Sequence, residues 1–158
     1  MPREKSTDDG TVRGVLYLRM SSAPQEKSIA QQRAEMSPRC TLEGVEVVHE
    51  FRDEAKSGGG MKKRNAFLDM VTFCQAEHDA GRPVHAIVCY DTSRFSRATS
   101  IKTARYIDEL MDAGVYRLLT AERWFDFRKE EDRAIFNIQQ DFTNNRYLRD
   151  LSQRILRG

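Results

Sequence analysis

The sequence predicts an α/β fold, in which helices flank a mostly parallel, Rossmann-like sheet of about four to five strands and a long C-terminal helix follows. Two observations lead to this fold class. Apolar runs of β-type residues alternate with helical patterns in the order β-α-β-α-β-α-β, which is typical of parallel sheets. The third run, VHAIVCY, is almost continuously apolar, as expected for a strand buried at the centre of such a sheet.

Most elements carry a recognisable signal at one end. A helix begins at Ser28, where Gln31 completes a capping box, and a second helix begins at Asn65. A third helix ends at Gly114. We expect strands at 12–19, 45–51, 84–90 and 115–120. The expected apolar faces of the second and third helices consist of Phe67, Leu68, Val71 and Cys74, and of Ile101, Ala104, Ile107 and Met111.

The chain divides into a polar leader over 1–11, which we expect to be disordered, a core over 12–129, and a long helix over 130–158. From 130 to 157 the tail has no glycine or proline, and apolar residues recur at helical spacings. Such a helix would reach about 42 Å, so we expect it to project from the core and to pack against a second copy of the chain. Its apolar stripe is Ile135, Ile138, Phe142, Leu148, Leu151 and Ile155.

Composition argues against several classes of protein. The net charge is only +2, so binding of nucleic acid would depend on locally clustered arginines. The N-terminus is polar and no apolar run is long enough to cross a bilayer, which argues against a signal peptide and a membrane helix. The three cysteines are far apart among apolar neighbours, and the three histidines share no ligand spacing. We therefore expect reduced core thiols, no metal site and a cytoplasmic location.

Polar and basic residues follow the first three predicted strands. Arg19 and Ser21 would point to the same side, because residues i and i+2 share one side of an extended chain. Open parallel sheets bind ligands beyond the carboxyl ends of their strands, so the arginines there should gather around one serine hydroxyl. Arginine grips phosphate with two donors, and a serine among arginines is suited to attack phosphorus. The candidates are Arg19, Ser21, Asp53, Ser57, Arg64, Arg94 and Arg97.

Less specific interpretations stay open at this point. One strand-end arginine is usually solvated, a glycine-rich loop can be a simple connector, Ser21 or Ser22 can cap a turn, and Gln25 and Gln32 are by default surface residues. The chain has no GxxxxGK[ST] loop, no GxGxxG motif and no histidine that follows a strand. The alternatives to an enzyme are a non-catalytic α/β module that binds phosphorylated ligands and a dimerisation module.

Three short motifs in the same order resemble those of serine recombinases, the resolvase and invertase superfamily. The first reads Tyr-x-Arg-x-Ser with a later Ser-x-x-x-Gln helix, the second Asp-x-x-x-Ser-Gly and then a basic residue, and the third ends in Arg-x-x-Arg. The tail is similar to the family's oligomerisation helix, and the SRFSR form of the third motif is most like the large serine recombinase branch. The matching residues are Tyr17, Arg19, Ser21, Gln25, Ser28, Gln32, Asp53, Ser57, Gly58, Arg64, Arg94, Arg97 and Arg154.

The resemblance implies a site-specific recombinase in which Ser21 attacks a DNA phosphodiester and forms a 5′-phosphoserine, without a metal or another cofactor. It assigns the phosphate to Arg19, Arg64, Arg94 and Arg97. The general base stays open. Ser93 stands where the family often has aspartate, with Asp91 two residues earlier, and Asn65 replaces the family's usual proline. Supporting roles fall to Gln25, Gln32, Asp53, Ser57, Ser93 and Arg154.

The resemblance also implies partners and an origin. The partners are a double-stranded DNA attachment or resolution site and further copies of the chain, as a dimer and as a tetramer in the synaptic complex. The protein would be encoded by a bacterium or a phage. Because no separate DNA-binding domain follows the long helix, we expect this chain to be the N-terminal catalytic part of a longer protein.

Overall fold

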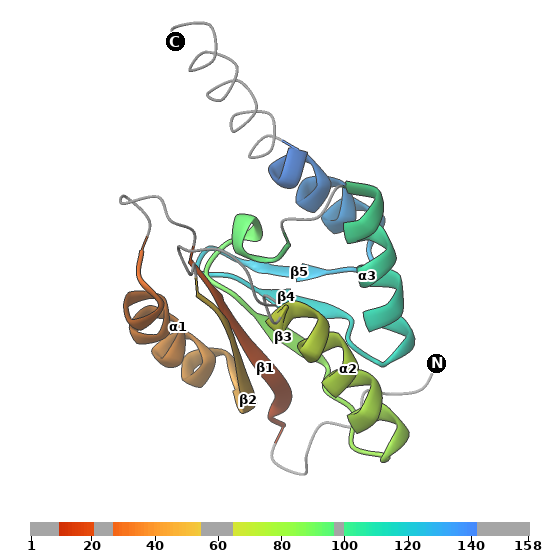
Figure 1. The fold of residues 1–158 in the computed structure, drawn as a ribbon, viewed down its shortest axis with the longest axis horizontal. Coiled ribbons are helices and arrows are strands. Elements are labelled where there is room, and N and C mark those ends of the chain that lie inside the picture. Colours follow the sequence, from red (N-terminus) through yellow and green to blue (C-terminus); the bar gives the residue numbers. More distant parts are fainter. Residues whose placement is uncertain (1–9, 21–26, 55–64, 97–99, 142–158) are drawn as a thin grey trace, which may run out of the picture.

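A computed structural model describes residues 10–20, 27–54, 65–96 and 100–141 of the chain. A helix over residues 130–141 is the last element described (Figure 1). The elements before it are β1 (Val12–Arg19), α1 (Ile29–Glu43), β2 (Val45–Asp53), α2 (Ala66–Asp79), β3 (Ala86–Val88), the 3₁₀ turn η1 (Thr92–Arg94), α3 (Ser100–Asp112), β4 (Arg117–Leu119) and β5 (Trp124–Asp126).

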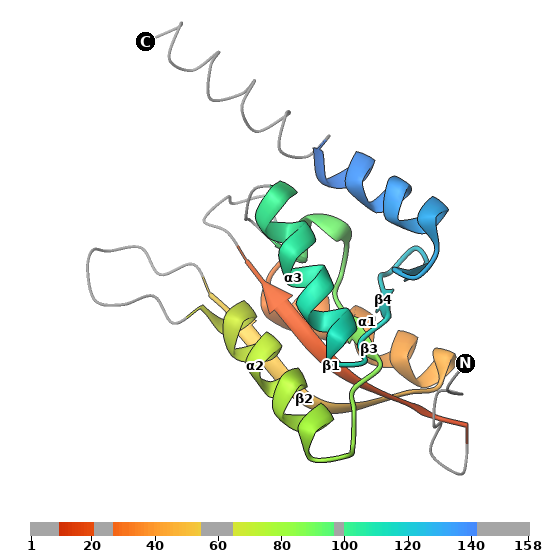
Figure 2. The same ribbon diagram turned by 90° about the vertical axis from the view of Figure 1, so that its right-hand side faces the viewer.

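The elements form one five-stranded sheet in the order β2-β1-β3-β4-β5. The first four strands are parallel, and β5 pairs antiparallel with β4. Helix α1 covers one face of the sheet, whereas α2, α3 and the helix over 130–141 cover the other (Figures 1 and 2). The predicted α/β class, with a mostly parallel sheet and flanking helices, is therefore confirmed.

Strand β1 divides its side chains between the two halves of the core. Val15 and Tyr17 belong to the cluster with α2 and α3, whereas Leu16 and Leu18 belong to the cluster with α1, as the two-residue repeat of a strand requires. The close approach of β1 to its neighbours depends on Gly14, because a Cβ atom there would lie 2.6 Å from Val45 Cγ1. The central position of β1 makes its carboxyl end a fixed point for the residues beyond it.

The predicted helix starts are present. Ser28 and Gln31 form both bonds of a capping box, with 2.9 and 3.1 Å between donor and acceptor, and Asn65 caps α2. Helix α1 continues through Pro38 to Glu43, and Met36 and Cys40 on either side of the proline are buried. Strand β2 is also longer than predicted and includes Asp53.

Three residues of the predicted apolar faces are exposed to solvent. Leu68 is 41% exposed, Ile101 is 77% exposed, and Ala104 is exposed as well. Spacings of three and four fit more than one face of a helix, and the buried face of α3 is turned away from Ile101 and Ala104, whereas in α2 only Leu68 lies off the buried face. Helix α2 buries Phe67, Met70, Val71 and Cys74, and α3 buries Thr103, Ile107 and Leu110. The short β5 was not predicted as a separate strand, and β3 and β4 are three residues each, shorter than the apolar runs that predicted them.

The helix predicted from about residue 130 begins there and is seated on the core. Phe136 is 1% exposed and its ring contacts those of Phe95, Phe125 and Phe127 at 5.4–6.1 Å between centroids. Ile138, in contrast, is exposed. The predicted continuation over 142–158 lies outside the described residues. Within the described part of the chain, no helix is both long and apolar enough to cross a membrane.

Candidate active site

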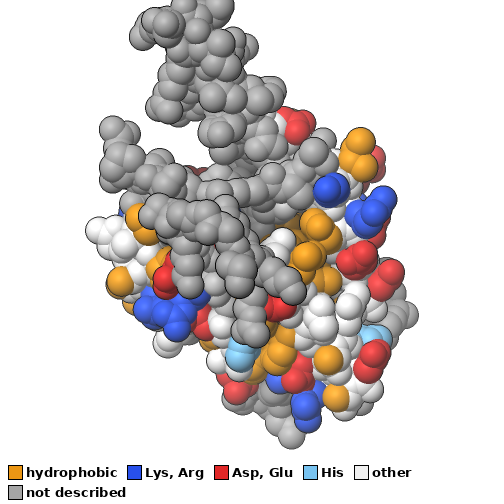
Figure 3. Space-filling model, in the orientation of Figure 1, with side chains coloured by type: hydrophobic (Ala, Val, Ile, Leu, Met, Phe, Trp, Pro, Cys, Tyr) orange, Lys and Arg blue, Asp and Glu red, His pale blue; other side chains and the backbone are white. Residues whose placement is uncertain are grey.

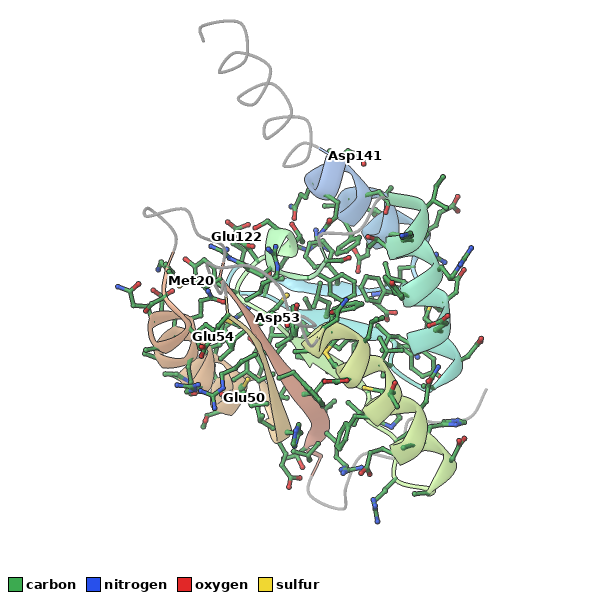
Figure 4. All side chains as sticks on the ribbon, viewed as in Figure 1. Met20, Glu50, Asp53, Glu54, Glu122 and Asp141 are labelled. Carbon is green, nitrogen blue, oxygen red and sulfur yellow. The ribbon has the colours of Figure 1, made fainter. Side chains whose placement is uncertain are left out.

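The carboxyl ends of β1, β2 and β3 bring several of the predicted site residues to one edge of the sheet. Arg19 and Asp53 end β1 and β2 and are paired in register, and the Met20 N–H donates to the Asp53 carbonyl at 3.1 Å. Figure 4 shows Met20 and Asp53 near these strand ends. The η1 turn follows β3 on the other side of β1. The residues that follow β1, β2 and β3 therefore lie at one edge of the sheet, as the order of the strands in the sequence predicted.

Arg19 is held from two directions at this edge. Its guanidinium Nη2 donates to the carbonyl oxygen of Ser93 in η1, and the residue is only 9% exposed. The side-chain amide of Gln32 donates to the Arg19 carbonyl at 3.0 Å and to the Lys27 carbonyl at 2.9 Å. Gln32 is fully buried, so its default interpretation as a surface residue is wrong. Helix α1 thus fixes the backbone of Arg19 while η1 fixes its side chain.

Arg94 lies in a tightly bonded turn. Asp91 caps η1, and its Oδ1 accepts from the Arg94 N–H at 3.1 Å and from the Ser93 hydroxyl at 2.5 Å. Arg94 is 6% exposed, so it is not an ordinary solvated arginine. Arg94 ends a single 3₁₀ turn, and Arg97 lies outside the described residues, so the arrangement of the two arginines relative to each other is not tested.

The other side of η1 is bonded to the helix over 130–141. The amide of Gln140 donates to the Thr92 carbonyl, and the Thr92 hydroxyl donates to Gln139 Oε1 at 3.1 Å. Gln140 and Thr92 are both buried. The turn that carries Arg94 is therefore bonded to β1 through Arg19 and to residues 139 and 140 of this helix.

Asp53 joins three elements through its carboxylate. Its Oδ2 accepts from the Tyr17 hydroxyl at 2.5 Å, and its Oδ1 accepts from the Ala66 N–H, the first of α2, at 2.9 Å. Burial, and then the bond to Asp53, raise the pKa of Tyr17 well above its ordinary value, so the phenol stays neutral and keeps donating. Asp53 therefore has a mainly architectural position beside Arg19.

The charges of this edge converge on one buried thiol. Burial raises the pKa of Cys89, and the nearby carboxylate of Asp91 raises it further, whereas the guanidiniums of Arg19 and Arg94 act in the opposite direction. The Cys89 thiol is fully buried and neutral. Cys40 and Cys74 are free and buried as well.

Acidic and basic side chains are interspersed over the described surface in the view of Figure 3. Within the described residues, the buried Arg19 and Arg94 supply basic side chains at the strand ends.

Several predicted site residues are not placed. Ser21, Gln25, Ser57, Arg64, Arg97 and Arg154 lie outside the described residues, so their positions stay predictions. Among the described residues, the structure connects Arg19, Gln32, Asp53, Ser93 and Arg94 through the contacts given above. The described residues contain no group of three side chains suited to hold a metal ion.

Sequence reasoning assigned no site role to four residues that organise this edge, although it named Tyr17 and Asp91. Tyr17 precedes Arg19 by two positions and so shares its side of β1, which is a signal that points to the same site. Asp91, two residues before Ser93, has the residue type of a cap. Thr92 and Gln140 gave no signal, because their bond joins positions 48 apart in the sequence.

Comparison with known proteins identifies the class to which this fold and site belong. The family model described as Resolvase, N terminal domain, matches residues 14–158, and the chain therefore belongs to the resolvase family of serine recombinases. No curated protein sequence matches the chain significantly.

Solved structures share the fold at low sequence identity. A resolvase family site-specific recombinase from Streptococcus pneumoniae is 22% identical, with a TM-score of 0.61 over 92% of this chain and 99% of that chain. The N-terminal catalytic domain of TP901-1 integrase is 16% identical, with a TM-score of 0.58 over 88% of this chain and 98% of that chain. The C-terminal catalytic domain of an IS607-like serine recombinase is 21% identical, with a TM-score of 0.52 and coverages of 83% and 78%.

Proposed function

We propose that this chain is the N-terminal catalytic domain of a site-specific DNA recombinase that cleaves and rejoins DNA through a 5′-phosphoserine. The observation that carries this proposal is the connection from Arg19 through Ser93 to Arg94, which sets two buried guanidiniums at the carboxyl edge of the sheet. Open parallel sheets bind ligands at that edge. Membership of the resolvase family supports recombination as the reaction.

In the proposed reaction, the hydroxyl oxygen of Ser21 attacks a DNA phosphorus. The Oγ–P bond forms while the P–O3′ bond breaks, the serine loses its proton to a base, and the departing 3′ oxygen takes one up. The reverse attack by a 3′ hydroxyl restores the phosphodiester after strands are exchanged. The bond between the serine and the DNA is itself a phosphodiester, so the energy of the broken bond is kept. The proposed series of steps therefore balances without ATP or a metal ion.

The arginines would stabilise the five-coordinate transition state. A guanidinium held in place before the reaction needs no reorganisation when charge develops on the phosphoryl oxygens, and removal of one such donor costs about 3–4 kcal/mol. Of the four arginines proposed to bind the phosphate, Arg19 and Arg94 lie in the described part of the chain, and Arg64 and Arg97 are the other two. Gln32 and Asp53 position the strand ends, and Gln25, Ser57, Ser93 and Arg154 stay in the proposal as supporting residues.

The proposed partners are a double-stranded DNA attachment or resolution site and further copies of the chain. A dimer, and a tetramer in the synaptic complex, would supply the several active sites that exchange of both strands requires. The exposed Ile138 on the helix over 130–141 supports this part of the proposal, because it belongs to the apolar stripe that continues along the sequence.

Formation of a covalent protein–DNA adduct tests the proposal. The protein encoded by the full gene is incubated with nicked duplexes that tile the DNA around that gene, and adducts are detected by denaturing electrophoresis. We expect an adduct with at least one duplex from wild type and from Ser22→Ala, and none from Ser21→Ala. An adduct that survives in Ser21→Ala would falsify the assignment of the nucleophile. Duplex binding without any adduct from wild type would instead favour a non-catalytic phosphate-binding module.

A further inference from the structure

The carboxylate of Asp91 is bonded to the turn that links the two buried arginines of the site. Asp91 lies three residues after the end of β3, and its backbone is extended, with φ −151° and ψ 174°. Its Oδ1 accepts both the Arg94 N–H at 3.1 Å and the Ser93 hydroxyl at 2.5 Å. One oxygen atom of Asp91 therefore fixes two consecutive residues of the turn.

These two residues lead to the two guanidiniums. Arg94 is the second residue fixed by Asp91, and its side chain is nearly buried. Ser93 is the first, and its carbonyl oxygen accepts from the guanidinium of Arg19 on the neighbouring strand. A rotation of the Ser93 peptide would move this acceptor away from Arg19. The position of Arg19 therefore depends on the same turn that places Arg94.

We propose that Asp91 is a positioning residue that holds Arg19 and Arg94 in one arrangement, ready for a phosphodiester. This inference rests on the proposed function. The other carboxylate at this edge, Asp53, has both oxygens bonded to Tyr17 and to the start of α2, so it is committed to the scaffold. Besides burial, which raises it most, the pKa of the Cys89 thiol is raised by Asp91 and lowered by Arg19 and Arg94, so all three charges act on the same buried group at this edge.

Two substitutions of Asp91 separate positioning from charge. Asp91→Asn keeps an oxygen that can accept both bonds and is an equally good cap, whereas Asp91→Ala removes both bonds. If the bonds position the arginines, the alanine variant should cleave at least about tenfold to a hundredfold more slowly at saturating DNA, because small misplacements of reacting groups have effects of this order. DNA affinity should change by less than about threefold, and Asp91→Asn should restore most of the rate.

The first readout is the rate of adduct formation with the nicked duplexes, measured apart from the dissociation constant for the same DNA. Asp112→Ala is the matched control, since Asp112 is exposed at the end of α3, away from this turn. The melting temperature of each variant confirms that the folded protein is assayed. A wild-type rate for Asp91→Ala at saturating DNA overturns the inference while the proposed function stands.

The second readout needs no DNA. The Nε–H signals of Arg19 and Arg94 in a ¹H–¹⁵N spectrum report the order of each guanidinium, and both should broaden or exchange faster in Asp91→Ala but not in Asp91→Asn. Unchanged signals in the alanine variant overturn the inference. If these signals change as expected but wild type forms no adduct with any duplex, the proposed function fails and the positioning by Asp91 remains.

Discussion

Tyr17 and Asp53 are joined by a hydrogen bond of 2.5 Å that crosses from β1 to β2 at the edge where Arg19 lies. The second oxygen of the same carboxylate accepts from the first N–H of α2. Two strands and a helix are thus bonded at one aspartate. Since both carboxylate oxygens are occupied, the strand ends keep a fixed separation beside the arginines.

Substitution of Tyr17 by phenylalanine tests this junction. The ring stays in place against Phe67, but the carboxylate loses its buried donor, so we expect a loss of about 1–3 kcal/mol in the free energy of unfolding. Urea denaturation measures it. Tyr106→Phe is the matched control, because the Tyr106 ring also packs on Phe67, at 5.2 Å, and its hydroxyl has no hydrogen bond to the described residues. Equal losses in the two variants would contradict the assigned role.

Substitution of Arg94 by lysine tests whether the fixed guanidinium acts on the reaction. Lysine keeps the charge but offers a compact donor in place of a planar one, so cleavage should fall by about a hundredfold while DNA affinity changes little. The rate of adduct formation at saturating DNA gives the answer. Arg105→Lys on the exposed surface of α3 should react at the wild-type rate. Normal cleavage by the Arg94 variant would make that residue a structural arginine only.

Substitution of Phe136 by alanine tests how firmly the helix over 130–141 is packed on the core. The side chain is buried among three phenylalanine rings, so Phe136→Ala should lower the free energy of unfolding by about 3–5 kcal/mol. Ile138→Ala, two residues away and 68% exposed, should change it by less than about 0.5 kcal/mol. Chemical denaturation distinguishes the two outcomes. A small effect at Phe136 would mean that this helix is only loosely attached.

Replacement of Gln140 by glutamate tests the bond to η1. The buried amide donates to the Thr92 carbonyl, and a carboxylate there would face an acceptor without a proton to share. We expect Gln140→Glu to lose at least about 1–3 kcal/mol of stability at neutral pH. Asn137→Asp, which makes the same change of charge at an exposed position of the same helix, should be close to neutral. Thermal melting of both variants measures the contrast, and similar melting temperatures would reject the bond.

The buried thiol of Cys74 predicts a dependence on alkaline pH. Burial raises the pKa of this thiol to about 12, whereas the pKa of a cysteine in an unfolded chain is about 8.5. The neutral thiol therefore contributes fully below about 8.5, and its contribution is lost as the pH rises toward 12, because only the unfolded state releases the proton.

Cys74→Ala removes this titration. The difference in unfolding free energy between wild type and the variant should shrink by about 2 kcal/mol between about pH 8 and pH 10, at up to about 1.4 kcal/mol per pH unit. Denaturation under reducing conditions at several pH values measures it. A difference that stays constant with pH would show that the thiol ionises equally in both states.

The parts of the fold that depend on neighbouring residues were predictable. The caps at Ser28 and Asn65 use side chains within three residues of the N–H groups they bind, so the sequence motif contains the whole interaction. The apolar run of β1 likewise predicts a buried strand, and strand order places Arg19 at the ligand edge.

The parts that depend on distant contacts were not predictable. Thr92 and Gln140 are 48 positions apart, and nothing local to either residue indicates their bond. The exposure of Ile101 follows from which side of α3 meets the sheet, a choice that spacing alone leaves open. The burial of Gln32 has the same origin, because one of its acceptors, the Arg19 carbonyl, belongs to a strand that only the folded chain brings within reach of the helix.

The contacts of the helix over 130–141 with the segment around Arg94 have a mechanical consequence. Phe136 packs on Phe95 and Gln140 bonds to Thr92, so the helix grips the segment 92–95 on both sides of Arg94. These two contacts lie on either side of Arg94 in the sequence. A displacement of Phe136 or Gln140 would therefore be passed directly to the residues that flank the arginine.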